Sequence, residues 1–150
     1  MKGKVREVKL KRIMKTVLFV CVHNAGRSQM AEAFFNHLAK GWVKAYSAGT
    51  QPVSTINPIV VEAMRAVGID ISKNKPKLMT LEMAEQADRV ITMGCGGIEE
   101  ACPGAIIHAE DWGLEDPRGK SLEVIRNIRD EIERRVTMLL DEIEPPEISR

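Results

Sequence analysis

The sequence predicts an α/β fold, a single domain in which a parallel four-stranded sheet is flanked by helices. Short apolar runs rich in valine and isoleucine alternate along the chain with segments whose apolar residues recur at helical spacing. This alternation is typical of parallel strands joined by helical crossovers. The expected strands are 17–20, 42–49, 89–93 and 105–108. Because sites in such folds lie at the carboxyl ends of the strands, we expect loops 21–28, 94–104 and 110–120 to gather at one edge.

Four helices are expected around this sheet. The first begins at Arg27 and ends before Gly41, and the others begin at the capping residues Asn57, Thr80 and Ser121. Pro145 and Pro146 end the last one. The residues expected to face the core are Met30, Ala31, Phe34, Phe35 and Leu38 in the first helix, Ile59, Val60, Ala63, Met64 and Val67 in the second, and Leu122, Ile125, Ile128, Ile132, Val136, Leu139 and Leu140 in the last.

Composition favours a soluble protein. The chain has 150 residues, 44% of them hydrophobic and 29% charged, with a formal net charge of +1. No apolar run approaches the ~20 residues that span a bilayer, and the N-terminus lacks the apolar stretch of a signal peptide. We therefore expect a cytoplasmic protein that binds neither membranes nor nucleic acid.

Charge is distributed unevenly along the chain. Residues 1–15 hold seven Lys or Arg and one Glu, whereas the remainder is mildly acidic. We expect 1–14 to be a basic extension that is disordered or dispensable, 15–144 to form the domain, and 145–150 to be a tail.

The segment 17–28, with the sequence VLFVCVHNAGRS, contains the strongest chemical signal. It places Cys21 and Arg27 on a loop between a buried strand and a helix, where backbone N–H groups and the helix dipole favour an oxyanion. Arg27 supplies a planar pair of donors, and the Ser28 hydroxyl can stabilise a Cys21 thiolate. The expected oxyanion-binding residues are Val22, His23, Asn24, Ala25, Gly26, Arg27 and Ser28.

Two loop residues have expected backbone roles. Asn24 tolerates the left-handed conformation and can fix the loop with its amide. Gly26 suits either a positive φ or a close backbone approach.

Cys95 and Cys102 follow the third expected strand, in a glycine-rich loop. Their spacing fits the usual zinc knuckle poorly, although a zinc site formed with Cys21 and a histidine stays an alternative, as do two incidental small core residues. A redox relay, in which one thiolate attacks a sulfur and a second resolves the disulfide, explains the pair better.

Asp116, followed by Pro117, lies in the loop after the fourth strand and is the expected general acid. Asp111 is the rival carboxylate. Trp112 is expected to pack in the core or to form a lid over the cleft. None of the three histidines is assigned a catalytic role.

These motifs together resemble the thioredoxin-coupled arsenate reductases, which share the fold and the flavodoxin-like strand order of low-molecular-weight protein tyrosine phosphatases. The resemblance rests on CVHNAGRS, the Cys95/Cys102 pair and DWGLEDPRGK, in the family's order, and covers about residues 15–140. It implies that Cys21 attacks arsenate, that Asp116 protonates the leaving oxygen, and that Cys95 and Cys102 then form a disulfide which a thioredoxin-like dithiol reduces. Gly26 stands where the members closest to the phosphatases carry a second cysteine.

The resemblance implies no required cofactor, but some members bind potassium beside the loop. The matching positions here are Asn24, Glu32, Ser47 and Asp70.

Two other functions stay open from the sequence. A low-molecular-weight protein tyrosine phosphatase would use Cys21, Arg27, Ser28 and Asp116 equally well through a phosphocysteine. It would not need Cys95 or Cys102, and no aromatic residue follows Pro117 to stack on a phenyl ring. The other alternative is a non-catalytic regulator that binds an anion or a metal.

Overall fold

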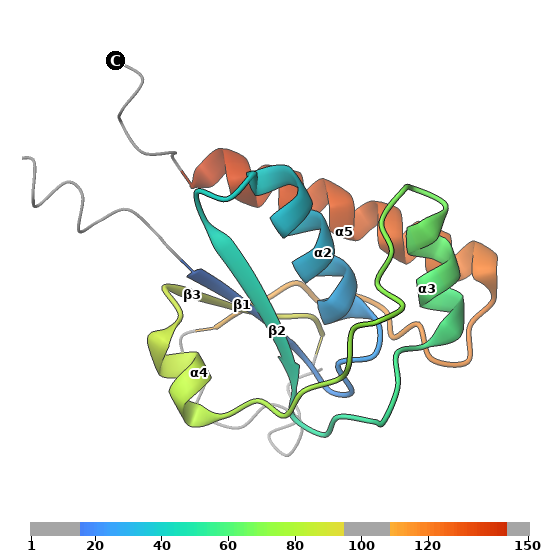
Figure 1. Cartoon of the computed structure of the whole chain (residues 1–150), viewed down its shortest axis with the longest axis horizontal. Coiled ribbons are helices and arrows are strands. Elements are labelled where there is room, and N and C mark those ends of the chain that lie inside the picture. The colour runs from blue at the N-terminus through green and yellow to red at the C-terminus, as the bar shows by residue number, and fades with distance from the viewer. Residues whose placement is uncertain (1–15, 95–108, 144–150) are drawn as a thin grey trace, which may run out of the picture.

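The described residues form a parallel sheet of four strands, the number predicted. The computed structural model describes residues 16–94 and 109–143, and its strands are β1 (Thr16–Cys21), β2 (Lys44–Gly49), β3 (Arg89–Thr92) and β4 (Glu110–Asp111). Their order is β2-β1-β3-β4, and each neighbouring pair is parallel (Figure 1). The α/β class and the flavodoxin-like order of these strands are therefore confirmed, with β1 at the centre of the sheet.

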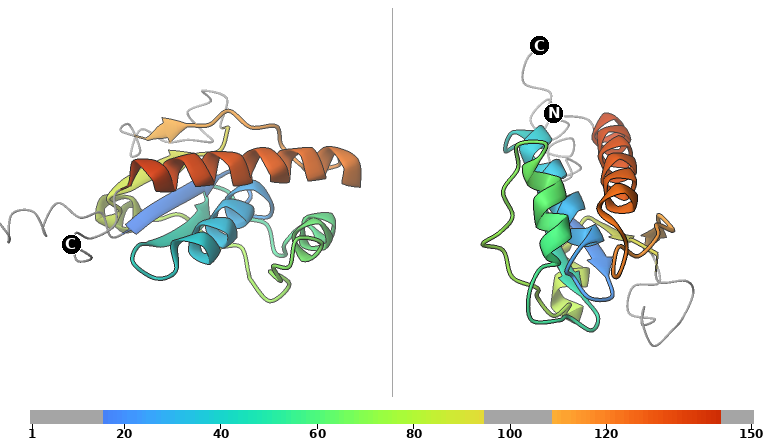
Figure 2. Two further views of the ribbon diagram at one scale, coloured as in Figure 1. Left: turned by 90° about the horizontal axis from the view of Figure 1, so that it is seen from above. Right: turned by 90° about the vertical axis from the view of Figure 1, so that its right-hand side faces the viewer.

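Helices cover both faces of β1. The described helices are α2 (Arg27–Ala39), α3 (Pro58–Arg65), α4 (Leu81–Gln86) and α5 (Leu122–Glu142). Val17, Phe19 and Cys21 belong to the core shared with α2, α3 and α5, whereas Leu18 and Val20 pack with residues around α4. The two sets alternate along β1 because successive side chains of a strand point to opposite faces. Figure 2 shows α2 and α5 lying over the same side of the sheet, where they contact each other.

The three predicted helix caps are present. Asn57 accepts a hydrogen bond from Ile59 N at 2.9 Å, Thr80 from Met83 N at 3.1 Å, and Ser121 from Val124 N at 3.3 Å. Each side chain satisfies an N–H group that the first turn of a helix leaves unpaired. Within residues 16–94 and 109–143, no helix has the length and apolar character needed to cross a membrane.

Some predicted details are wrong. The predicted loop 110–120 is not all loop, because Glu110 and Asp111 pair with Ile91 and Thr92 of β3. Both side chains are exposed, so this edge strand lacks the apolar pattern that marks a buried one. The second strand begins at Lys44, two residues later than predicted.

Two predicted core positions are also wrong, and for a third residue one of the two predicted roles is confirmed. Leu38 and Val67 are each 39% exposed, because they lie near the ends of their helical segments, beyond the covered part of the core. Trp112 is only 7% exposed and its ring lies 5.6 Å from that of Phe19, so it is a core residue and not a lid. The predicted strand 105–108, the extension 1–14 and the tail 145–150 lie outside the described residues.

Arg129 of α5 is a buried cation that the apolar pattern did not predict. Its Nη1 donates to the carbonyl oxygen of Ala63 at 2.9 Å, and its Nε donates to Asp130 at 2.8 Å. Ala63 lies in the last turn of α3, where carbonyl groups lack partners within the helix. Arg129 therefore fastens α3 to α5.

We expect Arg129→Met to destabilise the domain by about 1–3 kcal/mol, since it leaves the buried Ala63 carbonyl without a donor. Urea unfolding followed by circular dichroism measures the change. Arg126→Met, at an exposed position of the same helix, is the matched control. Equal losses in both variants would contradict the role of the Arg129–Ala63 bond.

Candidate active site

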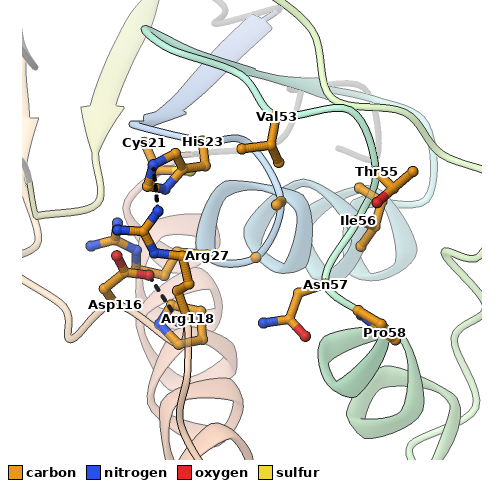
Figure 3. Close-up of a pocket in the computed structure, with 13 residues that line it drawn as sticks. Cys21, His23, Arg27, Val53, Thr55, Ile56, Asn57, Pro58, Asp116 and Arg118 are labelled. Atoms are coloured by element: carbon orange, nitrogen blue, oxygen red, sulfur yellow. Dashed lines mark hydrogen bonds between the residues drawn. The ribbon is translucent and has the colours of Figure 1, made fainter.

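A cavity of about 210 Å³ lies where β1 ends and α2 begins. Its walls come from the loop 21–28, from the segment 53–58 that leads into α3, and from residues 116–118 (Figure 3). Two of the three loops expected at this edge therefore meet here. The third, 94–104, is described only at Gly94.

The loop after β1 has its carbonyl groups turned away from its centre. Four of them accept hydrogen bonds from the segment 50–57, which we call the collar. The bonds run from the backbone N–H groups of Thr50, Gln51, Val53 and Asn57 to the carbonyl oxygens of Cys21, Val22, His23 and Ala25, respectively, at 2.7–3.2 Å. Gln29 Nε2 donates to the Asn24 carbonyl and Met30 N donates to that of Gly26. With its carbonyls directed outward, the loop can direct N–H groups toward an anion.

The Cys21 thiol receives polar contacts suited to a thiolate. Its Sγ lies 2.8 Å from Ser28 Oγ and accepts a hydrogen bond from Asn24 N at 3.2 Å. Because Ser28 Oγ already accepts from Asn24 Nδ2 at 2.7 Å, the Ser28 proton is free to point to the sulfur. Both contacts favour negative charge on Cys21, as a nucleophile requires.

Asn24 has the left-handed conformation that was predicted, with φ 52°. Its amide Nδ2 donates to Ser28 and to Ser47, and its Oδ1 accepts from Gln29 Nε2 at 3.0 Å and from Lys77 N at 2.8 Å. The prediction that this side chain fixes the loop is confirmed. Gln29, which is fully buried, was missed, and its only signal was a polar residue beside Met30 on the covered side of the helix.

Arg27 is a buried guanidinium, 4% exposed. Its Nη1 donates to the carbonyl oxygens of Met93 and Leu114, both at 2.9 Å, and these bonds orient the side chain. Its buried Nε has no hydrogen-bond partner among the described residues. A buried donor left unpaired is costly, so this edge of the guanidinium is suited to an oxyanion.

Gly26 is required for close approach and not for its φ. Of the two predicted reasons for a glycine here, a positive φ does not apply, since φ is −147°. A Cβ at this position would lie 2.7 Å from Cγ of Pro117. The absent side chain therefore lets the loop carrying Asp116 approach the loop carrying Cys21.

We expect Gly26→Ala to lower kcat for the reaction of this site by about tenfold, because the added methyl group displaces Pro117 and with it Asp116. Steady-state kinetics measures the effect, with thermal unfolding as a check of the fold. Gly41→Ala, at a positive φ of 96° and outside the cavity, is the control for backbone strain from a glycine replaced elsewhere. An unchanged kcat in Gly26→Ala would show that the contact does not position the acid.

Asp116 lines the cavity with Cys21 and Arg27, whereas Asp111 does not. Asp116 Oδ1 accepts a hydrogen bond from Arg118 N at 3.0 Å. Asp111 Oδ1 instead accepts from Thr92 Oγ1 at 2.7 Å and from Gly94 N at 2.8 Å, so it holds the end of β3. The geometry favours Asp116 over its rival as the acid.

His23 lies at the mouth of the cavity, and its Nε2 is 3.3 Å from Arg118 Nη1 (Figure 3). Burial and the guanidinium of Arg118 lower the pKa of the His23 ring, Arg27 adds to this, and Asp116 opposes it. These effects favour the neutral form of the ring. This contact between the two loops was not predicted.

The residues proposed for potassium are only partly together. Asn24 donates to Ser47 at 3.1 Å, and Ser47 donates to Glu32. Asp70 instead accepts from Ser72 N at 2.9 Å and contacts Arg65. Hydrogen bonds from the side chain and backbone of Ser72 lower the pKa of Asp70, and Arg65 adds to this. Asn24 Oδ1 already has two N–H donors. Asn24, Glu32 and Asp70 thus each have one side-chain oxygen that accepts a hydrogen bond, and the potassium site stays a prediction.

Cys95 and Cys102 lie outside the described residues. The residue before Cys95 is held in the site, because Gly94 N donates to Asp111 and Arg27 Nη1 lies 3.4 Å from the Gly94 carbonyl oxygen. A Cβ on Gly94 would lie 3.0 Å from that Nη1 and 2.6 Å from the Leu114 carbonyl oxygen. Gly94, the residue directly before Cys95, therefore lies beside Arg27.

Comparisons with known proteins agree with this geometry. Residues 16–147 match the family of low molecular weight phosphotyrosine protein phosphatases. Arsenate reductase 2 of Staphylococcus saprophyticus is 36% identical over 129 residues, which are 85% of this chain and 97% of that protein.

Two solved structures are also similar. An arsenate reductase in the phosphate binding state has 39% identity and a TM-score of 0.76, with 87% of this chain and 100% of that one covered. The thioredoxin-dependent arsenate reductase of Corynebacterium glutamicum has 40% identity and a TM-score of 0.70, with 93% of this chain and 66% of that one covered.

The chain therefore belongs to the low molecular weight phosphotyrosine protein phosphatase family. The three relatives described above, at 36–40% identity, are arsenate reductases, so the resemblance inferred from the motifs is confirmed.

Proposed function

We propose that this protein is an enzyme that reduces arsenate to arsenite, with Cys21 as the nucleophile. The observation that carries the proposal is one cavity that holds the Cys21 thiol with its two polar contacts, the unpaired Nε of Arg27 and the carboxyl group of Asp116. The relatives named arsenate reductase support arsenate as the substrate.

The first step uses the described residues. Arsenate lies on the N–H groups of residues 22–28 and on Arg27. The Cys21 thiolate attacks arsenic and forms an S–As bond, while one As–O bond breaks. Asp116 protonates the departing oxygen, which leaves as water. Arsenic is still As(V) in this adduct.

The electrons are transferred in the second step, for which we propose Cys95. Its thiolate attacks Sγ of Cys21 and forms a disulfide, and the S–As bond breaks with its electron pair on arsenic. Arsenic leaves as arsenite, As(III). Cys102 then attacks Cys95, which releases the Cys21 thiolate and leaves a Cys95–Cys102 disulfide.

A dithiol protein of the thioredoxin type completes the cycle by reducing this disulfide and becoming oxidised itself. The Corynebacterium glutamicum relative is a thioredoxin-dependent arsenate reductase, which supports a partner of this type. Such a relay requires a reducing compartment, so we place the protein in the cytoplasm.

Hydrolysis of phosphate monoesters is the second candidate function. The family match supports it, since the same nucleophile, arginine and acid serve a phosphocysteine mechanism. It leaves Cys95 and Cys102 without a role, and for that reason we rank it below arsenate reduction.

Parallel assays of the two reactions test the proposal. Arsenate-dependent NADPH oxidation is measured with thioredoxin and thioredoxin reductase, beside hydrolysis of para-nitrophenyl phosphate. We expect sustained NADPH oxidation with the wild type and none with Cys21→Ser. The exposed Thr137→Ser on α5 serves as a control for a small substitution outside the site.

Two other outcomes would each overturn the proposal. Ester hydrolysis without arsenate reduction would make the protein a phosphatase. Neither activity, together with a stoichiometric metal or a tightly bound anion in the purified protein, would favour the non-catalytic regulator.

A further inference from the structure

Besides the hydrogen bond from Arg27 to the Leu114 carbonyl, two contacts join the acid loop, residues 114–118, to the nucleophile loop, residues 21–28. Pro117 packs against Gly26, where only the absence of a Cβ allows the approach. The next residue, Arg118, reaches the ring of His23 with its guanidinium, with Nη1 and Nε2 3.3 Å apart. Figure 3 shows Arg118 extending beside Asp116 to His23.

The second contact fixes the protonation state of the ring nitrogen. A guanidinium only donates hydrogen bonds, so Nε2 of His23 must accept, and the ring proton must lie on Nδ1. The lowered pKa of His23 agrees with a neutral ring. The backbone of His23 is itself held, since its carbonyl accepts from Val53 N of the collar at 3.2 Å.

Arg118 also contacts the carboxyl group of Asp116. Its backbone N–H donates to Asp116 Oδ1 at 3.0 Å, so the orientation of the carboxyl group depends on where Arg118 lies. Oδ1 is thereby occupied, and Oδ2 is the oxygen left for proton transfer. The Arg118 side chain is exposed and long, and without an acceptor at its end it would have many conformations.

We propose that His23 is a positioning residue for the general acid, which it holds over the nucleophile through Arg118. This inference rests on the proposed function, because it assumes that Asp116 protonates the oxygen that leaves arsenic. Proton transfer demands close geometry, and a displacement of about 1 Å can cost about 10²-fold in rate.

Single-turnover formation of arsenite, followed with reduced protein at saturating arsenate, isolates the arsenic chemistry from the thioredoxin steps. We compare wild type, His23→Leu, His23→Gln, Asp116→Asn and the double variant His23→Leu/Asp116→Asn. Glutamine retains an acceptor near the position of Nε2, whereas leucine does not. His37→Leu, at an exposed histidine of α2, is the matched control.

We expect His23→Leu to lower the rate constant by about tenfold, His23→Gln by no more than about threefold, and Asp116→Asn by about 10²-fold or more. The arsenate concentration at half saturation should change less than twofold in His23→Leu. In the Asp116→Asn background, His23→Leu should have almost no further effect, because the group that it positions is absent.

Two results would overturn the inference. One is a wild-type rate in His23→Leu, and the other is the same loss with and without Asp116. Arg118→Met provides a second route, since it removes the donor without altering the nucleophile loop, and it should reproduce the His23→Leu rate. It also keeps the test open if His23→Leu does not fold.

Failure of the proposed function gives a different pattern. If the wild type forms no arsenite but hydrolyses esters, the function is wrong and the same variants are compared on phenyl and para-nitrophenyl phosphate. Phenolate needs a proton more than nitrophenolate does, so His23→Leu should slow phenyl phosphate more. Equal slowing of both esters overturns the positioning role, and a wild type inactive on all three substrates overturns both inferences.

Discussion

Replacing Arg27 by lysine is expected to lower the rate of arsenate reduction by about 10³-fold, the loss that follows when preorganised donors to a transition state are removed. Lysine retains the positive charge but lacks the planar set of N–H donors of a guanidinium. One Nη of Arg27 is held by the carbonyls of Met93 and Leu114, while Nε points from a buried position with no partner among the described residues. The single ammonium group of lysine cannot donate to these two carbonyls and also bind the oxyanion, since it lacks the fixed planar geometry of a guanidinium.

The rate is measured in the coupled NADPH assay, and anion affinity is measured separately as inhibition by inorganic phosphate. Arg126→Lys, at an exposed arginine of α5, is the matched control and should behave as wild type. Arg27→Lys should also weaken phosphate inhibition, because the same donors bind either oxyanion. Near-normal turnover in Arg27→Lys would mean that charge alone suffices and that the orientation of the guanidinium has no catalytic role.

Cys102→Ser is expected to stop multiple turnover completely while leaving one reduction intact. Cys21 and Cys95 can still form the first disulfide and release arsenite, but no thiol then resolves it. We therefore expect a burst of about one arsenite per protein chain and no arsenate-dependent NADPH oxidation afterwards. Rapid-quench measurement of arsenite separates the burst from the steady state.

Cys95→Ser is the companion variant and should give no burst, because the adduct on Cys21 has no sulfur nucleophile to release arsenite. Sustained turnover in Cys102→Ser would remove the three-cysteine relay. Ester hydrolysis should be insensitive to both substitutions, since a phosphocysteine is released by water.

Local sequence patterns were enough to predict the strand, the helix starts and one loop conformation around the site. The apolar run before Cys21 predicted a buried strand, and Asn57, Thr80 and Ser121 predicted helix starts that all carry the expected cap. Asn24 was predicted from the tolerance of its residue type for the left-handed conformation. Each of these inferences depends on neighbours within a few residues along the chain.

The features that were missed depend on distant or backbone partners. The collar donates through backbone N–H groups, which have no residue-specific signature. His23 and Arg118 are 95 residues apart, and nothing local to either one marks the pair. The edge strand β4 consists of two acidic residues, a composition more typical of a loop. For Gly26, the sequence allowed two reasons for a glycine, and only the position of Pro117 shows that contact is the operative one.

The outward-facing carbonyls of the nucleophile loop have a consequence for substrate discrimination. A ring of rigid amide donors recognises the size, shape and charge of a tetrahedral oxyanion, and arsenate and phosphate are nearly alike in all three. We expect phosphate to compete with arsenate for this loop, as the phosphate-bound state of a related arsenate reductase illustrates. Selectivity must then arise after binding, from electronic structure: arsenic(V) readily accepts an electron pair from sulfur, whereas phosphorus(V) does not. The site therefore accepts both oxyanions, and only the reduction step distinguishes arsenate from phosphate.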